Sequence, residues 1–531
     1  KRFRLIRSAF TLFLIIITVR LFNIQAITGK QYSTAAALQR TRNRPLYSER
    51  GDILDRNGIR FTGRETCWKA VLQPETLLGN PGNLRTVADI FNISVENLSK
   101  KISVSNLPYI AQVTQAQAEA IADSTLSGIS VINMRVRNSD ATLAPHILGY
   151  VDDKGGDGVY VGVIADAGNS YMSRYGYRIW DTMGKEKLDI RLTLDYHLQS
   201  IVEETRDRMV DKGAAVLLDI LTGEILAIAS RPDFDPSNVN VSLNDKNQPL
   251  FNRALGTYTP GSIFKIITVA AALEEGLSPD LTFYCPGYVE LGGTRMKCWD
   301  YEQGGHGTLN MAQAFAQSCN SYFINLGLKT GRNAIVDMAK KFGFGVKTGL
   351  YEEGIDEPSG KLPGTITPAS PVEIGNLSIG QGNILVTPVQ AANMTAAIAN
   401  GGILNEVSLI DAVVNAEGQR VRNIRSPSWR RVISKETAAS LQGMMLMTVK
   451  SGTGELADIG GCGGSAGKTG SAETGWVVDD RNILHAWFSG YFPTYDPRYA
   501  LCIFIEDGRS GASSAAPVFA EISARIMDMG Y

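Results

Sequence analysis

The chain has 531 residues, of which 44% are hydrophobic and 20% are charged, and these values exclude a wholly disordered protein. Its formal net charge is −1, so it lacks the basic excess that is typical of nucleic-acid-binding proteins. Six cysteines are too few for a disulfide-rich scaffold, and with only four histidines we expect the chemistry to rest on other side chains. At roughly 150 residues per domain, this length predicts about two to four domains.

The N-terminal residues have the pattern of a membrane anchor. Four basic side chains fall within residues 1–7, and an uninterrupted apolar run of 12 residues follows. Residues 8–27 give a 20-residue segment, about enough to span a bilayer, if Arg20 extends its charge towards the interface. We therefore predict a cytoplasmic tail over 1–7 and a single transmembrane helix over 8–27, with the rest of the chain outside. A cleaved signal peptide is the alternative, with small residues at 35–37 as its cleavage site.

Residues 28–188 mix short helical and strand-like stretches with many turn residues. Residues 115–123 have helical spacing, and residues 128–136 resemble a strand. No segment of this range has the pattern of an active site. We interpret residues 28–188 as an elongated, mixed pedestal domain.

Residues 189–531 are predicted to form a second domain, in which helices flank a mostly antiparallel sheet. A strand pattern at 190–194 precedes a helical pattern at 196–209 and a hairpin with its turn at Thr222 and Gly223. Residues 262–276 form an almost wholly apolar helix that ends at a glycine, so we expect it to be buried. Three more strands and a closing helix follow, at 467–473, 485–491, 499–506 and 517–529. The predicted fold class is therefore α/β or α+β.

Ser262 and Lys265 stand at the start of the apolar helix, one turn apart, so the amine is expected to lie beside the hydroxyl. A serine is a weak nucleophile until a base takes its proton, and burial lowers the pKa of a lysine towards that role. Ser318 and Asn320 add a hydroxyl that could relay a proton and an amide that could orient the lysine. Alone, the Ser-x-x-Lys spacing is a weak signal, because it arises often by chance.

Lys468, Thr469, Gly470 and Ser471 lie on a predicted strand behind a glycine-rich approach. A lysine, two hydroxyls and a glycine that permits close approach suit the docking of a carboxylate and an amide. The three motifs occur in a fixed order, each on a fitting element, which leaves coincidence at roughly one in a hundred or less. Together they predict an acyl-transfer site.

This motif set resembles that of the penicillin-binding proteins and the serine β-lactamases. Residues 49–58, ERGDILDRNG, resemble the segment just outside the membrane in class B penicillin-binding proteins, and 252–254 and 380–382 resemble the same family. Nothing resembles a glycosyltransferase domain, which indicates the monofunctional class. The chain departs from the family at Ser471 and Ile263, where threonine is usual, and neither change removes a group that the mechanism needs.

The resemblance implies a D,D-transpeptidase that cross-links peptidoglycan stem peptides through an acyl-enzyme on Ser262. Lys265 would be the general base, with Ser318 and Asn320 passing protons and holding the geometry. β-Lactams would acylate the same serine. The implied location is the outer face of the bacterial cell membrane, with a membrane-embedded glycan polymerase and cell-wall assembly proteins as partners.

The resemblance also implies how the substrate is held. Lys468, Thr469 and Ser471 would bind its terminal carboxylate, and the backbone N–H groups of Ser262 and Ser471 would form the oxyanion hole.

Two other functions share these motifs. A β-lactamase needs a dedicated way to activate water for deacylation, and it has no use for a pedestal or a retained anchor. A β-lactam sensor or an assembly scaffold is the other alternative; sensors generally carry several membrane spans, and a scaffold does not need a complete catalytic set.

Cys285, Cys298, His306 and Cys319 cluster within 35 residues, and their composition is typical of a zinc site. A Cys285–Cys298 disulfide and free thiols are the alternatives, although that disulfide leaves Cys319 unpaired and His306 without a role. Some elongation-type penicillin-binding proteins resemble this pattern and carry zinc with one ligand inside the Ser-x-Asn motif. Structural zinc is therefore the preferred interpretation, the pattern favours the elongation- or sporulation-like branch, and no organic cofactor is expected.

Overall fold

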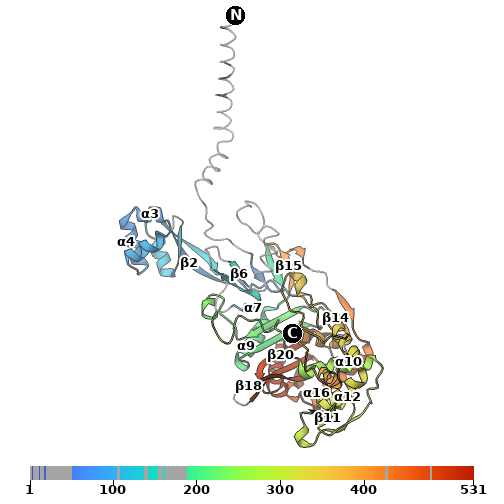
Figure 1. Cartoon of the computed structure of the whole chain (residues 1–531). Coiled ribbons are helices and arrows are strands. Elements are labelled where there is room, and N and C mark those ends of the chain that lie inside the picture. Colours follow the sequence, from blue (N-terminus) through green and yellow to red (C-terminus); the bar gives the residue numbers. More distant parts are fainter. Residues whose placement is uncertain are drawn as a thin grey trace. The chain divides into compact units, whose positions relative to one another are not determined.

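The computed structural model describes residues 51–104, 108–136, 142–152, 159–161, 188–366, 368–424, 428–478 and 481–531, and five isolated residues nearer the N-terminus. The chain divides into two compact units (Figure 1): one contains Lys1–Glu49 and Thr66–Arg135, and the other contains Arg50–Glu65 and Val136–Tyr531. Among the described residues, no helix is both long and apolar enough to cross a membrane. The predicted anchor at residues 8–27 lies almost wholly outside the described residues.

The smaller unit has the mixed content that was predicted for the pedestal. Its sheet has the order β3 (Tyr109–Val113), β2 (Glu65–Leu72), β4 (Ile129–Val136). Its described helices are α3 (Pro74–Leu78), α4 (Pro81–Ile90), α5 (Val95–Ile102) and α6 (Gln115–Ala122). Helix α6 begins at a capping box in which Thr114 and Gln117 bond to each other's backbone N–H, so the predicted helix at 115–123 is confirmed.

A five-stranded antiparallel sheet is the centre of the larger unit, as predicted. Its order is β18 (Ala466–Val478), β19 (Arg481–Phe492), β20 (Tyr499–Gly508), β8 (Gly213–Asp219), β9 (Ile225–Arg231). Val216 and Phe504 belong to the hydrophobic core on one face, whereas Leu217 and Ile503 belong to the core on the other. Since both faces are covered, β8, β9 and β20 are mostly apolar in the sequence, whereas β18 and β19 contain more polar residues.

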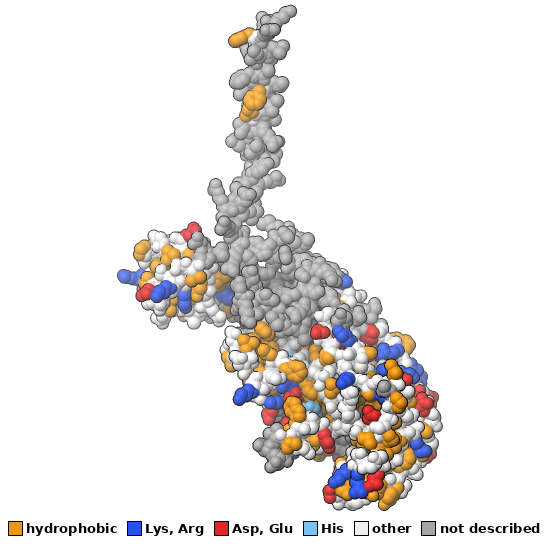
Figure 2. All heavy atoms as spheres, in the orientation of Figure 1, with side chains coloured by type: hydrophobic (Ala, Val, Ile, Leu, Met, Phe, Trp, Pro, Cys, Tyr) orange, Lys and Arg blue, Asp and Glu red, His pale blue; other side chains and the backbone are white. Residues whose placement is uncertain are grey.

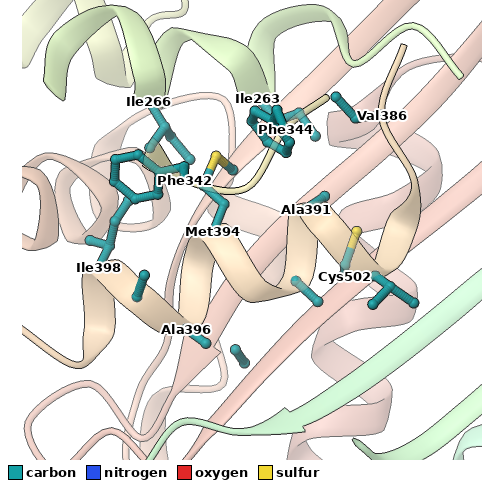
Figure 3. Packing of buried hydrophobic residues seen from close by; sticks show 14 of the residues in the cluster. Ile263, Ile266, Phe342, Phe344, Val386, Ala391, Met394, Ala396, Ile398 and Cys502 are labelled. Atoms are coloured by element: carbon teal, nitrogen blue, oxygen red, sulfur yellow. The ribbon is translucent and has the colours of Figure 1, made fainter. Parts of the chain in front are cut away.

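Helices cover the two faces of the sheet. One face carries α9 (Tyr196–Met209) and α17 (Ala516–Asp528); the other carries α10 (Lys265–Glu274), α12 (Asn320–Thr330), α15 (Pro388–Ala399) and α16 (Lys435–Ser451). All 12 residues of α15 are buried, and the helix starts at a capping box formed by Thr387 and Gln390. Figure 3 shows its Met394 and Ile398 packed beside Phe342 and Ile266. Helix α15 therefore connects the sheet with the helices above it.

The segment that resembles class B penicillin-binding proteins packs onto the larger unit. Strand β1 (Ile53–Leu54) pairs in parallel with β7 (Asp189–Leu192), in a sheet that continues with β15 (Ile410–Val414) and β16 (Arg420–Asn423). Asp55 is fully buried; one carboxylate oxygen accepts the N–H groups of Asn57 and Ile59, and the other accepts that of Tyr196. Asp55 thus holds the turn that follows β1 against the N-terminus of α9.

A buried glutamate on α9, which is paired with an arginine, also binds the backbone near Ala144, within the range that was predicted to be the pedestal. One oxygen of Glu203 accepts the backbone N–H of Ala144 at 2.6 Å, and the other lies 3.2 Å from Arg231 Nη2. The Glu203 and Arg231 side chains are each only 6% exposed. Burial raises the pKa of Glu203, and the nearby Arg231 opposes that shift.

Replacing Glu203 by alanine is expected to lower the free energy of unfolding by about 3 kcal/mol, because it removes the buried carboxylate that accepts from the Ala144 N–H, from Gln199 and from Arg231. Arg231 keeps its ion pairs with Asp207 and Asp233. The next residue, Glu204, is 57% exposed and pairs with Arg525, so Glu204→Ala is expected to cost at most about 1 kcal/mol. Thermal unfolding of the two variants compares them. Equal decreases in melting temperature would contradict the prediction.

Candidate active site

The segment that carries the predicted nucleophile, called the nucleophile turn below, is a 3-10 turn rather than the first turn of an α-helix. Ser262 lies in η3 (Gly261–Phe264), and α10 begins only at Lys265. Gly261 has a φ of +56°, its N–H donates to Gly380 O at 2.9 Å, and a Cβ on it would lie 2.6 Å from Ser471 O. This contact from outside the helix tightens the turn, which corrects the sequence prediction that the helix starts at Ser262.

Lys265 joins the first motif to the second. It is fully buried, and its Nζ donates to Ser318 O at 2.7 Å, to Ser318 Oγ at 3.2 Å and to Asn320 Oδ1 at 2.7 Å. Burial lowers the pKa of Lys265 to about 8, although the thiol groups of Cys298 and Cys319 oppose the shift. An amine with this pKa is partly neutral near physiological pH, so it can act as a base.

Ser318 adopts a backbone conformation that residues other than glycine rarely adopt. Its φ is +52°, and it lies between α11 (Met311–Ala316) and α12. Cys319 follows as the N-cap of α12, where its Sγ accepts the N–H of Tyr322 at 3.5 Å. A strained backbone conformation of this kind persists only where the surrounding structure fixes it. Here it points the hydroxyl of Ser318 towards Lys265.

The third motif lies on β18, at the edge of the central sheet. Lys468 is fully buried, and its Nζ lies 3.3 Å from Thr469 O and 3.4 Å from Thr469 Oγ1. Burial, together with the charge of Lys265, lowers the pKa of Lys468. An approaching carboxylate would supply the missing negative charge, so this lysine is suited to docking an anionic group.

Two further residues of this motif have distinct surroundings. A Cβ on Gly470 would lie 3.0 Å from Ile263 Cγ2 and 3.0 Å from Trp487 Cβ, so glycine lets the strand pack against the nucleophile turn. Ser471 is exposed, and its Oγ accepts the N–H of Gly511 at 3.1 Å. The three motifs predicted from the sequence are thus assembled around one point of the larger unit.

Thr453 is a site residue that the sequence analysis missed. Its hydroxyl lies 2.6 Å from that of Thr469, and its N–H donates to Ala316 O at 3.0 Å. It follows α16, which packs against both α11 and β18. The sequence signal that could have indicated Thr453 is the pair of glycines on either side of it, Gly452 and Gly454. A Cβ on Gly452 would lie 2.4 Å from Ala316 O, so glycine is needed for this close approach.

We expect Thr453→Val to slow acylation by penicillin about tenfold, because the Thr469 hydroxyl loses a hydrogen-bond partner worth about 1–3 kcal/mol. Thr453→Ser keeps the hydroxyl and should restore most of the rate. The second-order rate constant for acylation measures both variants. A slow rate in both would contradict the role of the hydroxyl and indicate a packing role for the side chain.

The four predicted metal ligands also come together. Their ligand atoms all lie within 4.8 Å of one another. His306 Nδ1 is 3.7 Å from Cys285 Sγ and 3.6 Å from Cys298 Sγ, and the sulfurs of Cys298 and Cys319 are 4.0 Å apart. Tetrahedral zinc with Zn–S bonds of ~2.3 Å places two sulfurs about 3.8 Å apart, so the spacing fits that metal. No disulfide joins any of the described cysteines, which does not favour the disulfide alternative.

A small lobe carries three of these ligands. Strand β10 (Phe283–Cys285) pairs with β13 (Gly307–Leu309), and β11 (Tyr288–Leu291) pairs with β12 (Thr294–Lys297). The fourth ligand, Cys319, separates Ser318 from Asn320. The cluster therefore ties the lobe directly to the second catalytic motif.

Charges of both signs are distributed over the described surface of the larger unit. On the face that Figure 2 shows, basic and acidic side chains are interspersed rather than gathered by sign. This distribution is consistent with the net charge of −1.

The fold and the site together define a class of protein: a serine-type acyltransferase in which a buried lysine follows a serine by three residues and a second buried lysine lies on the edge strand of the central sheet. Residues 213–524 match the family of the penicillin-binding protein transpeptidase domain, and residues 45–216 match the penicillin-binding protein dimerisation domain. The chain belongs to the class B penicillin-binding proteins, in which a dimerisation domain precedes the transpeptidase domain.

Individual proteins agree with this assignment. Stage V sporulation protein D of Bacillus subtilis is 30% identical, over 96% of this chain and 82% of its own length. The peptidoglycan D,D-transpeptidase MrdA of Acinetobacter baumannii is 28% identical, over 95% of this chain and 85% of its own. Penicillin-binding protein PBP2 of Helicobacter pylori, solved in complex with MreC, has the same fold, with a TM-score of 0.72, 22% identity, and coverage of 92% of this chain and 99% of that one.

Proposed function

We propose that Ser262 is the nucleophile, and Lys265 the general base, of this peptidoglycan D,D-transpeptidase. The observation that carries the assignment is the buried amine of Lys265, which has a lowered pKa and is bonded to both Ser318 and Asn320. Among the described residues, the contacts of Lys265 include no carboxylate that would hold its amine in the charged form, which suits it to accept a proton. The family and the curated relatives support the reaction class.

The first half-reaction forms an acyl-enzyme. The terminal carboxylate of the donor stem peptide docks against Lys468 and Thr469, which places the preceding carbonyl over Ser262. Lys265 takes the hydroxyl proton as Ser262 Oγ attacks that carbonyl. The developing oxyanion is held by the backbone N–H groups of Ser262 and Ser471. The C–N bond then breaks, and the leaving D-alanine amine receives its proton through Ser318.

The second half-reaction transfers the acyl group. An amine from a neighbouring stem attacks the ester carbonyl, loses a proton to the same lysine, and forms the cross-link as Ser262 regains its proton. A β-lactam enters the first half-reaction in the same way. Its ring opens without a leaving group that departs, so the adduct on Ser262 persists.

Intact mass spectrometry of the soluble region with excess penicillin tests this proposal. We expect one stable adduct on the wild-type protein and none on Ser262→Ala, whose nucleophile is absent. Rapid return to the unmodified mass, with the drug consumed, would indicate a β-lactamase. A wild-type protein that takes up no penicillin would overturn both enzymatic functions and favour a scaffold.

We also propose that Cys285, Cys298, His306 and Cys319 hold a structural zinc ion. Three thiolates and one imidazole form a closed tetrahedral set that leaves no position for substrate. Hydrogen bonds from Cys319 and His306 lower the pKa of Cys298 to about 3, which favours the thiolate that a metal requires. When bound, the metal would hold Ser318 and Asn320 in place rather than take part in the reaction, because Cys319 lies between these two residues.

Finally, we propose that residues 8–27 anchor the protein in the cell membrane, with both units on the outer face. The supporting observation is the apolar run behind a basic tail. A membrane-embedded glycan polymerase and cell-wall assembly proteins are the proposed partners; the related PBP2 forms a complex with MreC. Protease protection in spheroplasts tests the topology, and digestion of the catalytic domain only after lysis would overturn it.

A further inference from the structure

The side chain of Trp487 joins the nucleophile turn to the central sheet, and the proposed reaction gives this residue no role. Trp487 lies on β19 and is fully buried. Its Nε1–H donates to the carbonyl oxygen of Thr259 at 3.1 Å. Thr259 lies three residues before Ser262, so this bond reaches the backbone that leads into the nucleophile turn. A buried indole N–H needs an acceptor, and here the acceptor lies outside the sheet that carries the tryptophan.

The backbone of the same residue pairs with the strand that carries the third motif. Trp487 is the cross-strand partner of Gly470, which lies between Thr469 and Ser471 on β18. A Cβ on Gly470 would lie 3.0 Å from Trp487 Cβ and 3.1 Å from Pro260 O, just before the nucleophile turn. With glycine at position 470, the turn, the third motif and the tryptophan are therefore in direct contact.

Other hydrogen bonds fix the approach to the nucleophile turn from a different side. Tyr258 exchanges two backbone hydrogen bonds with Val386, both at 2.9 Å. Gly261 donates its N–H to Gly380 O at 2.9 Å. Both partners belong to residues 380–386, so these bonds hold the turn against the chain just before α15. The bond from Trp487 instead holds it against the central sheet.

Aromatic neighbours restrict the indole ring. Phe504, the cross-strand partner of Trp487 on β20, has its ring centroid 4.5 Å from that of the tryptophan. The ring centroid of Tyr258 lies 6.3 Å away, on the other partner of this contact, the segment before the turn. A close-packed ring cannot rotate freely, so the N–H group stays directed at Thr259.

We propose that Trp487 is a positioning residue for acylation, whose indole N–H fixes the place of Ser262 relative to the third motif. The inference rests on the proposed function, in which Lys468 and Thr469 hold the substrate carboxylate and so place the reacting carbonyl relative to β18. Ser262 Oγ must then lie about 3–3.5 Å from that carbonyl, and a misplacement of about 1 Å can cost about 100-fold in rate. By binding Thr259 from the strand next to β18, Trp487 sets this separation.

Replacement of Trp487 alone by benzothienylalanine tests the proposal, because sulfur takes the place of the indole N–H and the ring keeps its size and shape. We expect the maximal rate of acylation by penicillin to fall about tenfold. The dissociation constant of the complex that precedes acylation should change less than twofold, because Lys468 and Thr469 are untouched. Stopped-flow measurements over a range of penicillin concentrations give both constants for the full-length protein. Fluorotryptophan at the same position keeps the N–H and should restore the wild-type rate.

Two controls separate positioning from packing. The same benzothienylalanine replacement at Trp476, whose side chain is 73% exposed, should leave both constants unchanged. Phe504→Leu removes the ring beside the indole but leaves the donor to Thr259. It should lower the melting temperature more than the replacement at Trp487 does, and it should reduce the maximal rate less.

Three results would overturn the inference. They are a maximal rate that is unchanged without the N–H, a loss that fluorotryptophan does not reverse, and an equal loss of rate in Phe504→Leu, which would indicate packing alone. Failure of the proposed function looks different, because the wild-type protein would then form no penicillin adduct, or the Ser262→Ala variant would still form one.

Discussion

Replacement of Lys265 by methionine is expected to lower the rate at which penicillin acylates Ser262 by about 10²- to 10⁴-fold, the usual contribution of a general base. Methionine keeps the length and apolar bulk of the buried side chain but has no amine to accept the hydroxyl proton. Stopped-flow measurement with a fluorescent penicillin gives the second-order rate constant. The matched control is Lys329→Met, which changes an exposed lysine on α12 and should leave that rate unchanged.

The pH dependence of acylation separates a catalytic base from a structural lysine. The pKa of Lys265 is lowered to about 8, and only the neutral amine accepts a proton. Below that pH the neutral fraction, and with it the wild-type rate, falls about tenfold per pH unit; above it the rate levels off. The Lys265→Met variant should lose this dependence. A flat wild-type profile, or a variant that acylates at nearly the wild-type rate, would show that Lys265 is not the base.

Local sequence signals were sufficient to predict many of the helices and strands of the larger unit. The predicted helix at 196–209 has the observed bounds because Asp195 caps it, accepting the N–H groups of His197 and Leu198. Strands β8, β9 and β20 were predictable because both faces of the central sheet are buried, which makes these strands largely apolar.

Features that depend on distant contacts were not predictable from those signals. The 3-10 turn at Ser262 is set by Gly380, which lies far along the chain, and by the strand that carries Ser471. The left-handed conformation of Ser318 depends on Lys265, and the place of Thr453 depends on how α16 packs. The motifs therefore indicated which residues form the site, whereas their geometry came from tertiary packing.

Removal of the proposed zinc is expected to have the second large effect. Native mass spectrometry of the soluble region should show an excess mass of about 65 Da for one bound ion. Cys298→Ser removes a ligand and should abolish that excess. Cys462→Ser is the matched control, because Cys462 is a partly exposed cysteine outside the cluster and its loss should leave the metal in place. A wild-type protein without excess mass would contradict the zinc assignment.

The metal should also affect catalysis, although none of the four residues proposed to bind it has a role in the proposed reaction. Cys319 stands between Ser318 and Asn320, and both of these bind the amine of Lys265. Without the metal, only the hydrogen bonds from Lys265 and local packing keep Ser318 in its strained conformation, so Cys298→Ser is expected to slow acylation about tenfold or more. The chelator-treated wild-type protein should show the same loss, and added zinc should reverse it. If acylation stays at the wild-type rate after the metal is gone, the cluster stabilises the lobe but does not position the catalytic motif.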